Sequence, residues 1–242
     1  MRKDLRNRTV YFLRDVRYAV IFRALRQHCR GRVLDVGGWD FFLTARRKKV
    51  PFSHWTTLEY DADHVLDPGD ERYALVHGDG CSMTFEDESF DTVLNIQVLE
   101  HVFEPIRMVE ECARVLKQGG TGIFVVPQTG VVHGAPHHYY NFTIFWIREA
   151  MARAGLDIVE ITPMGGVWNT AASHLLFFVL YSYRRRLKSP TGARRNWVFY
   201  VLYPLMVFYA LLNIPVCLFL SLGDLAEEAN NHLVVVRKPV RA

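Results

Sequence analysis

The stretch VLDVGGWDFF, residues 33–42, joins a short apolar run to a glycine turn that also carries acidic residues. In parallel α/β sheets, ligands bind beyond the carboxyl ends of the strands, and glycine there lets the backbone approach the ligand closely. The run therefore predicts a buried strand, and the turn after it predicts a first candidate binding site. Trp39 stands where such a turn most needs a small residue.

Further apolar runs follow at intervals typical of strands, and helical patterns lie between them. A helix is predicted over residues 104–116, because Pro105 suits a first turn and KQGG, residues 117–120, closes it. A second helix is predicted over residues 143–155. The predicted strands are residues 32–36, 55–59, 73–79, 90–96, 122–127, 156–162 and 231–239. This alternation predicts an α/β fold with a doubly wound, mostly parallel seven-stranded sheet.

The chain divides into four predicted parts. These are a basic amphipathic N-terminal helix in residues 1–30, a core in 31–163, an apolar helical insertion in 164–229, and the last core strand with a tail in 230–242. The N-terminal helix itself is read from residues 4–29 and ends at Gly31. Two interpretations of it stay open: a helix that caps the sheet, or one that lies against anionic lipid.

The insertion is more apolar than a surface excursion should be. Residues 197–222 contain no charged residue and are long enough to cross a bilayer, but Pro204, Asn213 and Pro215 argue against a plain span. If residues 167–183 also crossed, the basic loop 184–195 would lie on the far side, against the positive-inside tendency. We therefore expect the insertion to dip into one leaflet at the cytoplasmic face of a membrane. The alternative is a buried helical pair that forms a homodimer interface.

Composition narrows the class of partner. The 242 residues carry a net charge of +4, with arginine and lysine concentrated near the N-terminus and in residues 184–195. This positive charge borders long aliphatic runs rather than interleaved aromatics, so a lipid surface fits better than nucleic acid. The four cysteines show no zinc or CxxC spacing, and no signal peptide is evident, so reduced thiols in a cytosolic setting are expected.

Two more acidic residues end predicted strands. Glu59 follows the second strand, where a carboxylate can accept hydrogen bonds from both hydroxyls of a ribose. Asp79 closes the third strand and is placed to meet a base edge, while Gly80 and Cys81 offer backbone N–H groups. Together with the glycine turn, these residues predict a nucleoside ligand.

In this order the motifs resemble the class I S-adenosylmethionine-dependent methyltransferases, type 11. The resemblance covers residues 31–163 and the last strand, and its specific segments are ESFDTVLNIQVLEHV, residues 88–102, and ARVLKQGG, residues 113–120. It implies S-adenosylmethionine as the cofactor. By resemblance, Asp35, Gly37 and Gly38 line its amino-acid end, Glu59 binds the ribose, Asp79 meets the adenine, and Asn95 to Gln97 form the floor below the sulfonium.

The sequence departs from this family at Trp39 and Phe41, where relatives usually have glycine. In one interpretation Trp39 points away or packs beside the cofactor; in the other it fills the pocket and cofactor binding is lost. A dinucleotide oxidoreductase fits less well, because the G-x-G-x-x-G spacing is missing.

Methyl transfer depends mainly on positioning the acceptor, with a base only where the acceptor must lose a proton. The candidate catalytic residues are His101 above the fourth strand and His137 and Tyr139 after the fifth. The element PHHYYNFT, residues 136–143, resembles P-H-D-Y-F-R-Y-T of many relatives, with His138 and Asn141 at its Asp and Arg positions. His133 and His137 are also candidate metal ligands, but no neighbouring acid completes a set, so no metal is predicted.

The sequence thus predicts a methyltransferase that acts on a membrane-associated or lipid-linked small-molecule acceptor. The alternative is a non-catalytic, membrane-associated scaffold with a methyltransferase fold and an altered cofactor pocket.

Overall fold

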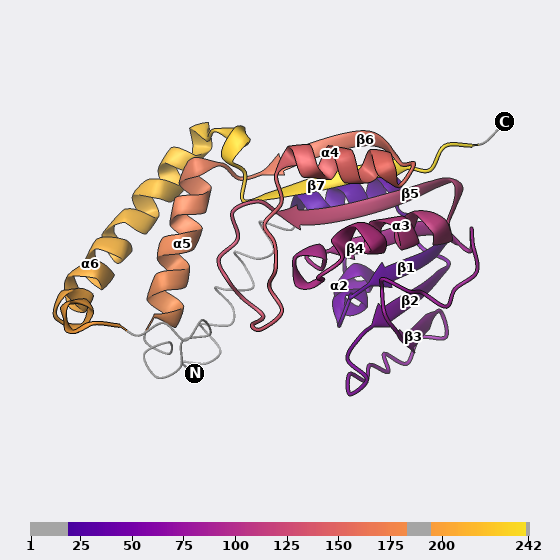
Figure 1. The fold of residues 1–242 in the computed structure, drawn as a ribbon, viewed down its shortest axis with the longest axis horizontal. Coiled ribbons are helices and arrows are strands. Elements are labelled where there is room, and N and C mark those ends of the chain that lie inside the picture. Colours follow the sequence, from indigo (N-terminus) through magenta and orange to yellow (C-terminus); the bar gives the residue numbers. More distant parts are fainter. Residues whose placement is uncertain (1–18, 183–194, 241–242) are drawn as a thin grey trace.

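A computed structural model describes residues 19–182 and 195–240. Within these residues, one sheet of seven strands has the order β3-β2-β1-β4-β5-β7-β6 (Figure 1). The strands are β1 (Arg32–Val36), β2 (His54–Glu59), β3 (Tyr73–His77), β4 (Phe90–Ile96), β5 (Leu116–Pro127), β6 (Asp157–Met164) and β7 (Asn231–Arg237). β7 runs antiparallel to both of its neighbours, whereas β1 to β5 pair in parallel. The predicted fold class is confirmed.

Helices cover both faces of the sheet because its strands are apolar on both sides. On one face α3 (Pro105–Val115) and α4 (Ile144–Arg153) pack on residues such as Val93 and Val234. On the other face lie α2 (Phe41–Arg47) and the helical residues 19–28, which bury Phe22 and Leu25 against Val33. The described part of the N-terminal helix thus covers the sheet, and the rest of that prediction lies outside the described residues.

Several elements differ from the sequence prediction. The segment 117–120, expected to close a helix, lies in a bulged start of β5, where Phe90 pairs with Leu116 but Thr92 pairs with Thr121. Strand β6 continues through Pro163 to Met164, since a sheet edge tolerates the missing proline N–H. The connection between β2 and β3 has no helix, and aspartates in it accept hydrogen bonds from N–H groups two residues later, as Asp67 does from Gly69.

Between β6 and β7 the chain forms a helical hairpin of α5 (Val167–Tyr181) and α6 (Trp197–Leu220), which lie side by side and extend away from the sheet (Figure 1). Short 3₁₀ turns, η3 (Ser221–Gly223) and η4 (Ala226–Glu228), return the chain to β7. Asp224 closes the base of the hairpin, because its carboxylate accepts the N–H groups of Trp168 at 2.8 Å and Asn169 at 2.9 Å. The prediction for the basic loop lies outside the described residues, except at Arg195.

Candidate functional site

The strand order reverses between β1 and β4, and the glycine turn lies there. Gly37 has φ +66°, and a Cβ on it would lie 2.8 Å from Cγ2 of Val98. A Cβ on Gly38 would lie 2.0 Å from Oδ2 of Asp35. Only glycine therefore fits at both positions, and the turn forms one wall of the open edge of the sheet.

A pocket of about 580 Å³ opens at this edge; we call it the large pocket. It is built from the turns after β1, β2, β3 and β4 and from the loop after β5. The predicted site residues that line it are Gly37, Glu59, Asp79, Gly80, Cys81, Gln97, His101, His137 and Tyr139.

A second cavity of about 190 Å³, the small pocket, is lined by Asp35, Gly38, Trp39 and Gln97 among others. Asp35 is 1% exposed, and neither of its carboxylate oxygens has a hydrogen-bond partner within the described residues. Burial raises the pKa of Asp35 well above its usual value, the nearby carboxylate of Glu59 raises it further, and the nearby indole of Trp55 lowers it in part. An unpartnered buried carboxylate is costly, so this group is poised to accept N–H donors from a ligand.

Asn95 does not line any of the described pockets, contrary to the predicted floor. It is fully buried, and its amide donates to Sδ of Met108 at 3.2 Å. Met108 and Gln97, rather than Asn95, line the large pocket. Asn95 lies behind Met108, its hydrogen-bond partner, and Met108 presents its side chain to the pocket instead.

Trp39 does not line the large pocket, but it does line the small pocket beside Asp35 and Gly38. It adopts φ 48°, its indole stacks on His64 with ring centroids 4.0 Å apart, and it is 49% exposed. Of the two interpretations of this residue, the structure favours the one in which the tryptophan points away or packs beside the cofactor, because the large pocket is open and Trp39 lies at the wall of the small one.

Glu59 is held in place by the glycine turn. Its Oε2 accepts the backbone N–H of Trp39 at 3.1 Å, and the side chain is 7% exposed. Burial raises the pKa of Glu59, and the Trp39 N–H lowers it in part. The contact uses backbone alone, so it does not require a tryptophan at position 39.

The turn after β3 is more closed than predicted. The Cys81 N–H, expected to face a ligand, donates to Oδ1 of Asp79 at 2.8 Å. A Cβ on Gly80 would lie 2.5 Å from Cε of Met108, so the backbone packs directly on α3. Burial raises the pKa of the Cys81 thiol to about 11, which keeps it protonated at neutral pH.

The three predicted catalytic residues come together at the mouth of the large pocket. The carbonyl of His137 accepts a hydrogen bond from Nδ1 of His101. Nδ1 of His137 and the hydroxyl of Tyr139 are 2.9 Å apart, and the Tyr139 N–H donates to the carbonyl of Glu100 at 2.8 Å. The loop after β5 is thus fastened to the segment that follows β4.

Sequence reasoning missed several residues of this site. Besides Val36, Leu58 and Gly78 within or next to the strands, those that line the large pocket are Tyr60, Val98, Val102, Phe103, Glu104 and Met108. Tyr60 directly follows the predicted Glu59, and the others lie around the start of α3. Their position after a strand was the one feature of the sequence that could have predicted them as pocket residues.

We expected no acidic residue near His133 and His137, and for His133 this prediction is wrong. Oε1 of the fully buried Glu100 lies 3.8 Å from Nε2 of His133, because the loop after β5 folds back over the end of β4. Glu100 and His133 are too far apart in sequence for spacing alone to reveal this contact.

A third cavity, of about 230 Å³, lies between α5 and the core; we call it the α5 pocket. Its lining includes Ser173, His174 and Phe177 from α5, together with His133 and Gln97. Gln97 lines all three cavities and is fixed by a hydrogen bond from its Nε2 to Oδ1 of Asn231 at 3.0 Å. Helix α5 therefore lies next to the residues that line the large and small pockets.

Comparison with known proteins gives a consistent result. A family model described as a methyltransferase domain matches residues 21–124. A probable S-adenosylmethionine-dependent methyltransferase of Mycolicibacterium smegmatis is 30% identical over 153 residues, which cover 60% of this chain and 56% of that protein. A phosphatidylethanolamine N-methyltransferase of Cereibacter sphaeroides is 34% identical over 158 residues, 57% of this chain and 77% of that protein.

Among solved structures, a phosphoethanolamine N-methyltransferase 2 of Haemonchus contortus, bound to phosphomonomethylethanolamine and S-adenosylhomocysteine, superposes with a TM-score of 0.58. It is 16% identical, and the match covers 93% of this chain and 53% of that one, so the likeness concerns the fold. The chain spans about half the length of the first curated relatives it matches.

Proposed function

Because the chain belongs to the family of class I S-adenosylmethionine-dependent methyltransferases, we propose that it methylates a membrane-associated or lipid-linked small molecule at the cytoplasmic face of a membrane. The acceptor atom is an oxygen, a nitrogen or a carbon. One curated relative is, by its name, an enzyme that methylates the headgroup of a lipid.

The residues present fit S-adenosylmethionine, which supplies an activated methyl group on a sulfonium. The unpartnered carboxylate of Asp35 beside Gly38 fits the ammonium end of the cofactor. Glu59 on the wall of the large pocket fits the ribose hydroxyls, and Asp79 fits the adenine amino group. The glycines leave room for close approach, because a Cβ at either position would clash.

The chain's own residues then have to position the acceptor and handle a proton. His137 and Tyr139 form a hydrogen-bonded pair on the pocket wall, which suits them to take a proton from an acceptor oxygen or nitrogen. Nδ1 of His101 is engaged by the carbonyl of His137, so His101 holds this loop in place. A catalytic role for each of the three stays a prediction.

The exposed apolar surface of the hairpin carries the membrane part of the proposal. Within the described residues, Trp197–Gly223 is the one helix long and apolar enough to cross a membrane, and 11% of its apolar window is buried. A core helix of a soluble protein would be mostly buried, and this helix lies far from the N-terminus. The α5 pocket shares the lining residue Gln97 with the large pocket, so helix α5 of the hairpin lies next to the space proposed for the cofactor.

The first test is calorimetric binding of S-adenosylhomocysteine to detergent-solubilised full-length protein, with Glu59→Ala as the control. Micromolar binding that the variant loses supports a working cofactor site. Absence of binding in the folded wild type would contradict the proposal and favour the scaffold alternative.

The second test asks for the acceptor. Labelled methyl groups from S-adenosylmethionine should enter the organic phase of a reaction that contains membrane extract. Transfer only to water-soluble compounds would contradict the membrane-bound acceptor while leaving methyl transfer intact.

A further inference from the structure

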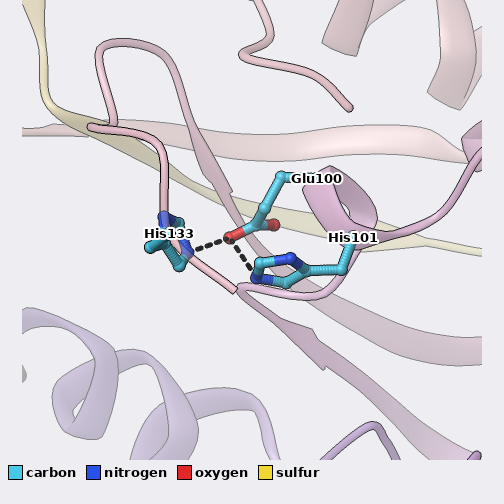
Figure 2. A group of neighbouring side chains, drawn as sticks. All are labelled: Glu100, His101 and His133. Carbon is cyan, nitrogen blue, oxygen red and sulfur yellow. Dashed lines mark ion pairs between the residues drawn. The ribbon is translucent and has the colours of Figure 1, made fainter. Parts of the chain in front are cut away.

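Three potential ligand atoms converge beside the large pocket. Oε1 of Glu100 lies 3.9 Å from Nε2 of His101 and 3.8 Å from Nε2 of His133. All three atoms lie within 4.8 Å of one another. Figure 2 shows the carboxylate of Glu100 between the two imidazole rings, with His133 arriving on the loop after β5.

Both imidazoles are oriented by backbone carbonyls. Nδ1 of His101 is hydrogen-bonded to the carbonyl of His137, and Nδ1 of His133 to the carbonyl of Val131 at 2.8 Å. A carbonyl accepts only, so each ring carries its proton on Nδ1 when neutral, and each Nε2 turns a lone pair toward Glu100. Such a carbonyl contact to the other ring nitrogen is typical of histidines that bind metals.

No other described residue donates a hydrogen bond to the carboxylate of Glu100. The side chain is fully buried, neither carboxylate oxygen has a hydrogen-bond partner within the described residues, and burial raises the pKa of Glu100 to about 7. The two nitrogens are too distant for a normal hydrogen bond to it. Three lone-pair atoms therefore face one another with no protein donor between them.

We propose that Glu100, His101 and His133 bind one divalent transition-metal ion through Oε1 and the two Nε2 atoms. A cation at their centre satisfies all three lone pairs and neutralises the buried carboxylate. Gly134 supports the arrangement, because a Cβ there would lie 2.8 Å from Cε1 of His101. The loop can cross the ring only with glycine at this position.

The three ligand atoms indicate which class of metal ion fits the site. Two imidazoles and one carboxylate suit Zn²⁺ or Fe²⁺, whereas Mg²⁺ prefers oxygen ligands and retains water. Zinc bonds of about 2.1 Å place tetrahedral ligands about 3.4 Å apart, so the side chains need to move inward by roughly half an ångström. Three protein ligands leave at least one coordination position open.

The open coordination position lets the ion bind the methyl acceptor. This role rests on the proposed function. His101 lines the large pocket and His133 lines the α5 pocket, so the ion lies at the boundary between cofactor and acceptor spaces. An acceptor oxygen bound there is held in place and loses its proton more readily. The acceptor class that fits is one with an ionisable oxygen, such as a phenol or a phosphate ester.

The test is a titration of chelator-treated, tag-free full-length protein with Zn²⁺ by calorimetry and with Co²⁺ by visible absorption. We expect one ion per chain, and a loss of affinity of about 100-fold or more in Glu100→Gln and His133→Asn. His54→Asn, at an exposed histidine on β2, should bind as the wild type does. Mg²⁺ should compete with neither ion.

Thermal unfolding separates lost ligands from lost folding. Zn²⁺ should raise the Tm of the wild type but not that of Glu100→Gln, which without metal should be at least as stable as the wild type. No saturable binding, or equal binding by the wild type and both variants, would overturn the metal site. S-adenosylhomocysteine binding measured on the same samples shows independently whether the cofactor site works.

Discussion

Strand β5 and helix α6 are both strongly apolar, yet their side chains face opposite surroundings. In β5, Ile123 and Phe124 are fully buried at the centre of the sheet. In α6, Phe208 is 65% exposed and Phe219 is 71% exposed, and only Ala210 and Cys217 are buried within it. Apolar sequence alone therefore does not indicate burial within the chain.

The two regions differ in what covers their apolar side chains. The apolar side chains of β5 are covered by helices on both faces, so their burial stabilises the fold. Those of α6 form a large exposed apolar surface, and such surfaces mark contacts with membranes or other proteins. Within the described residues the apolar side chains of β5 are covered, whereas most of those of α6 are exposed, and the proposed membrane contact would cover them.

The largest effect should come from truncating the same side chain in the two regions. Phe124→Ala should lower the free energy of unfolding by about 3–5 kcal/mol, because it leaves a cavity in the core. Phe208→Ala should change it by no more than about 0.5 kcal/mol. Urea unfolding in mild detergent measures both. An equal loss in the two variants would show α6 buried between copies of the chain, which is the homodimer alternative.

A smaller effect should separate exposed phenylalanines on the hairpin and on the core. Phe208→Ser should weaken binding to anionic vesicles by about 1.5–3 kcal/mol, or roughly ten- to hundred-fold, because the ring no longer enters lipid. Phe145 on α4 is 78% exposed and serves as the matched control. Vesicle flotation should show no change for Phe145→Ser. Equal losses, or no binding by the wild type, would contradict membrane docking through α6.

Sequence patterns were sufficient for the parts that depend on local chemistry. The alternation of apolar runs predicted the sheet, and the residues that end its strands, such as Glu59 and Asp79, do line one pocket. Position after a parallel strand fixes where a residue lies in space, so these side chains could be assigned without knowing their contacts.

Sequence patterns did not predict contacts that depend on the path of a loop across the core. Nothing in the spacing of Glu100 and His133 shows that the loop after β5 crosses the end of β4. The environment of α6 was also left open, because an apolar helix can face a core, a partner or a lipid. The exposed fraction of its side chains, known only from the structure, narrows that choice to the last two.

Substitution of Asp35, a buried polar residue of the core, should have a still smaller effect on stability. Asp35 is buried without a hydrogen-bond partner and its pKa is raised, so Asp35→Asn, which cannot ionise, should raise the free energy of unfolding at pH 7 by roughly 1 kcal/mol, a little less than the equivalent of one pKa unit. The same variant should lose S-adenosylhomocysteine binding.

The raised pKa of Asp35 predicts how its contribution to the free energy of unfolding changes with pH. Its folded pKa lies well above the ordinary value of 3.8, so its contribution to stability is greatest below that value and is lost as the pH rises through the folded pKa. The advantage of Asp35→Asn should therefore grow as the pH rises, in urea unfolding at a series of pH values. An advantage that shrinks with rising pH would show that Asp35 is charged and paired in the folded protein.

The smallest effect is expected at Trp39, an exposed aromatic residue of the core region that has a local partner. Trp39→Gly removes the stack on His64 but also relieves a left-handed backbone conformation, so stability should change by no more than about 0.5 kcal/mol. The contact of Glu59 with this residue is made by the backbone and is retained in the variant. S-adenosylhomocysteine affinity should therefore change by less than about tenfold, and vesicle binding should not change. A large gain in affinity would mean that the tryptophan blocks the pocket in solution, and the scaffold alternative would then be preferred.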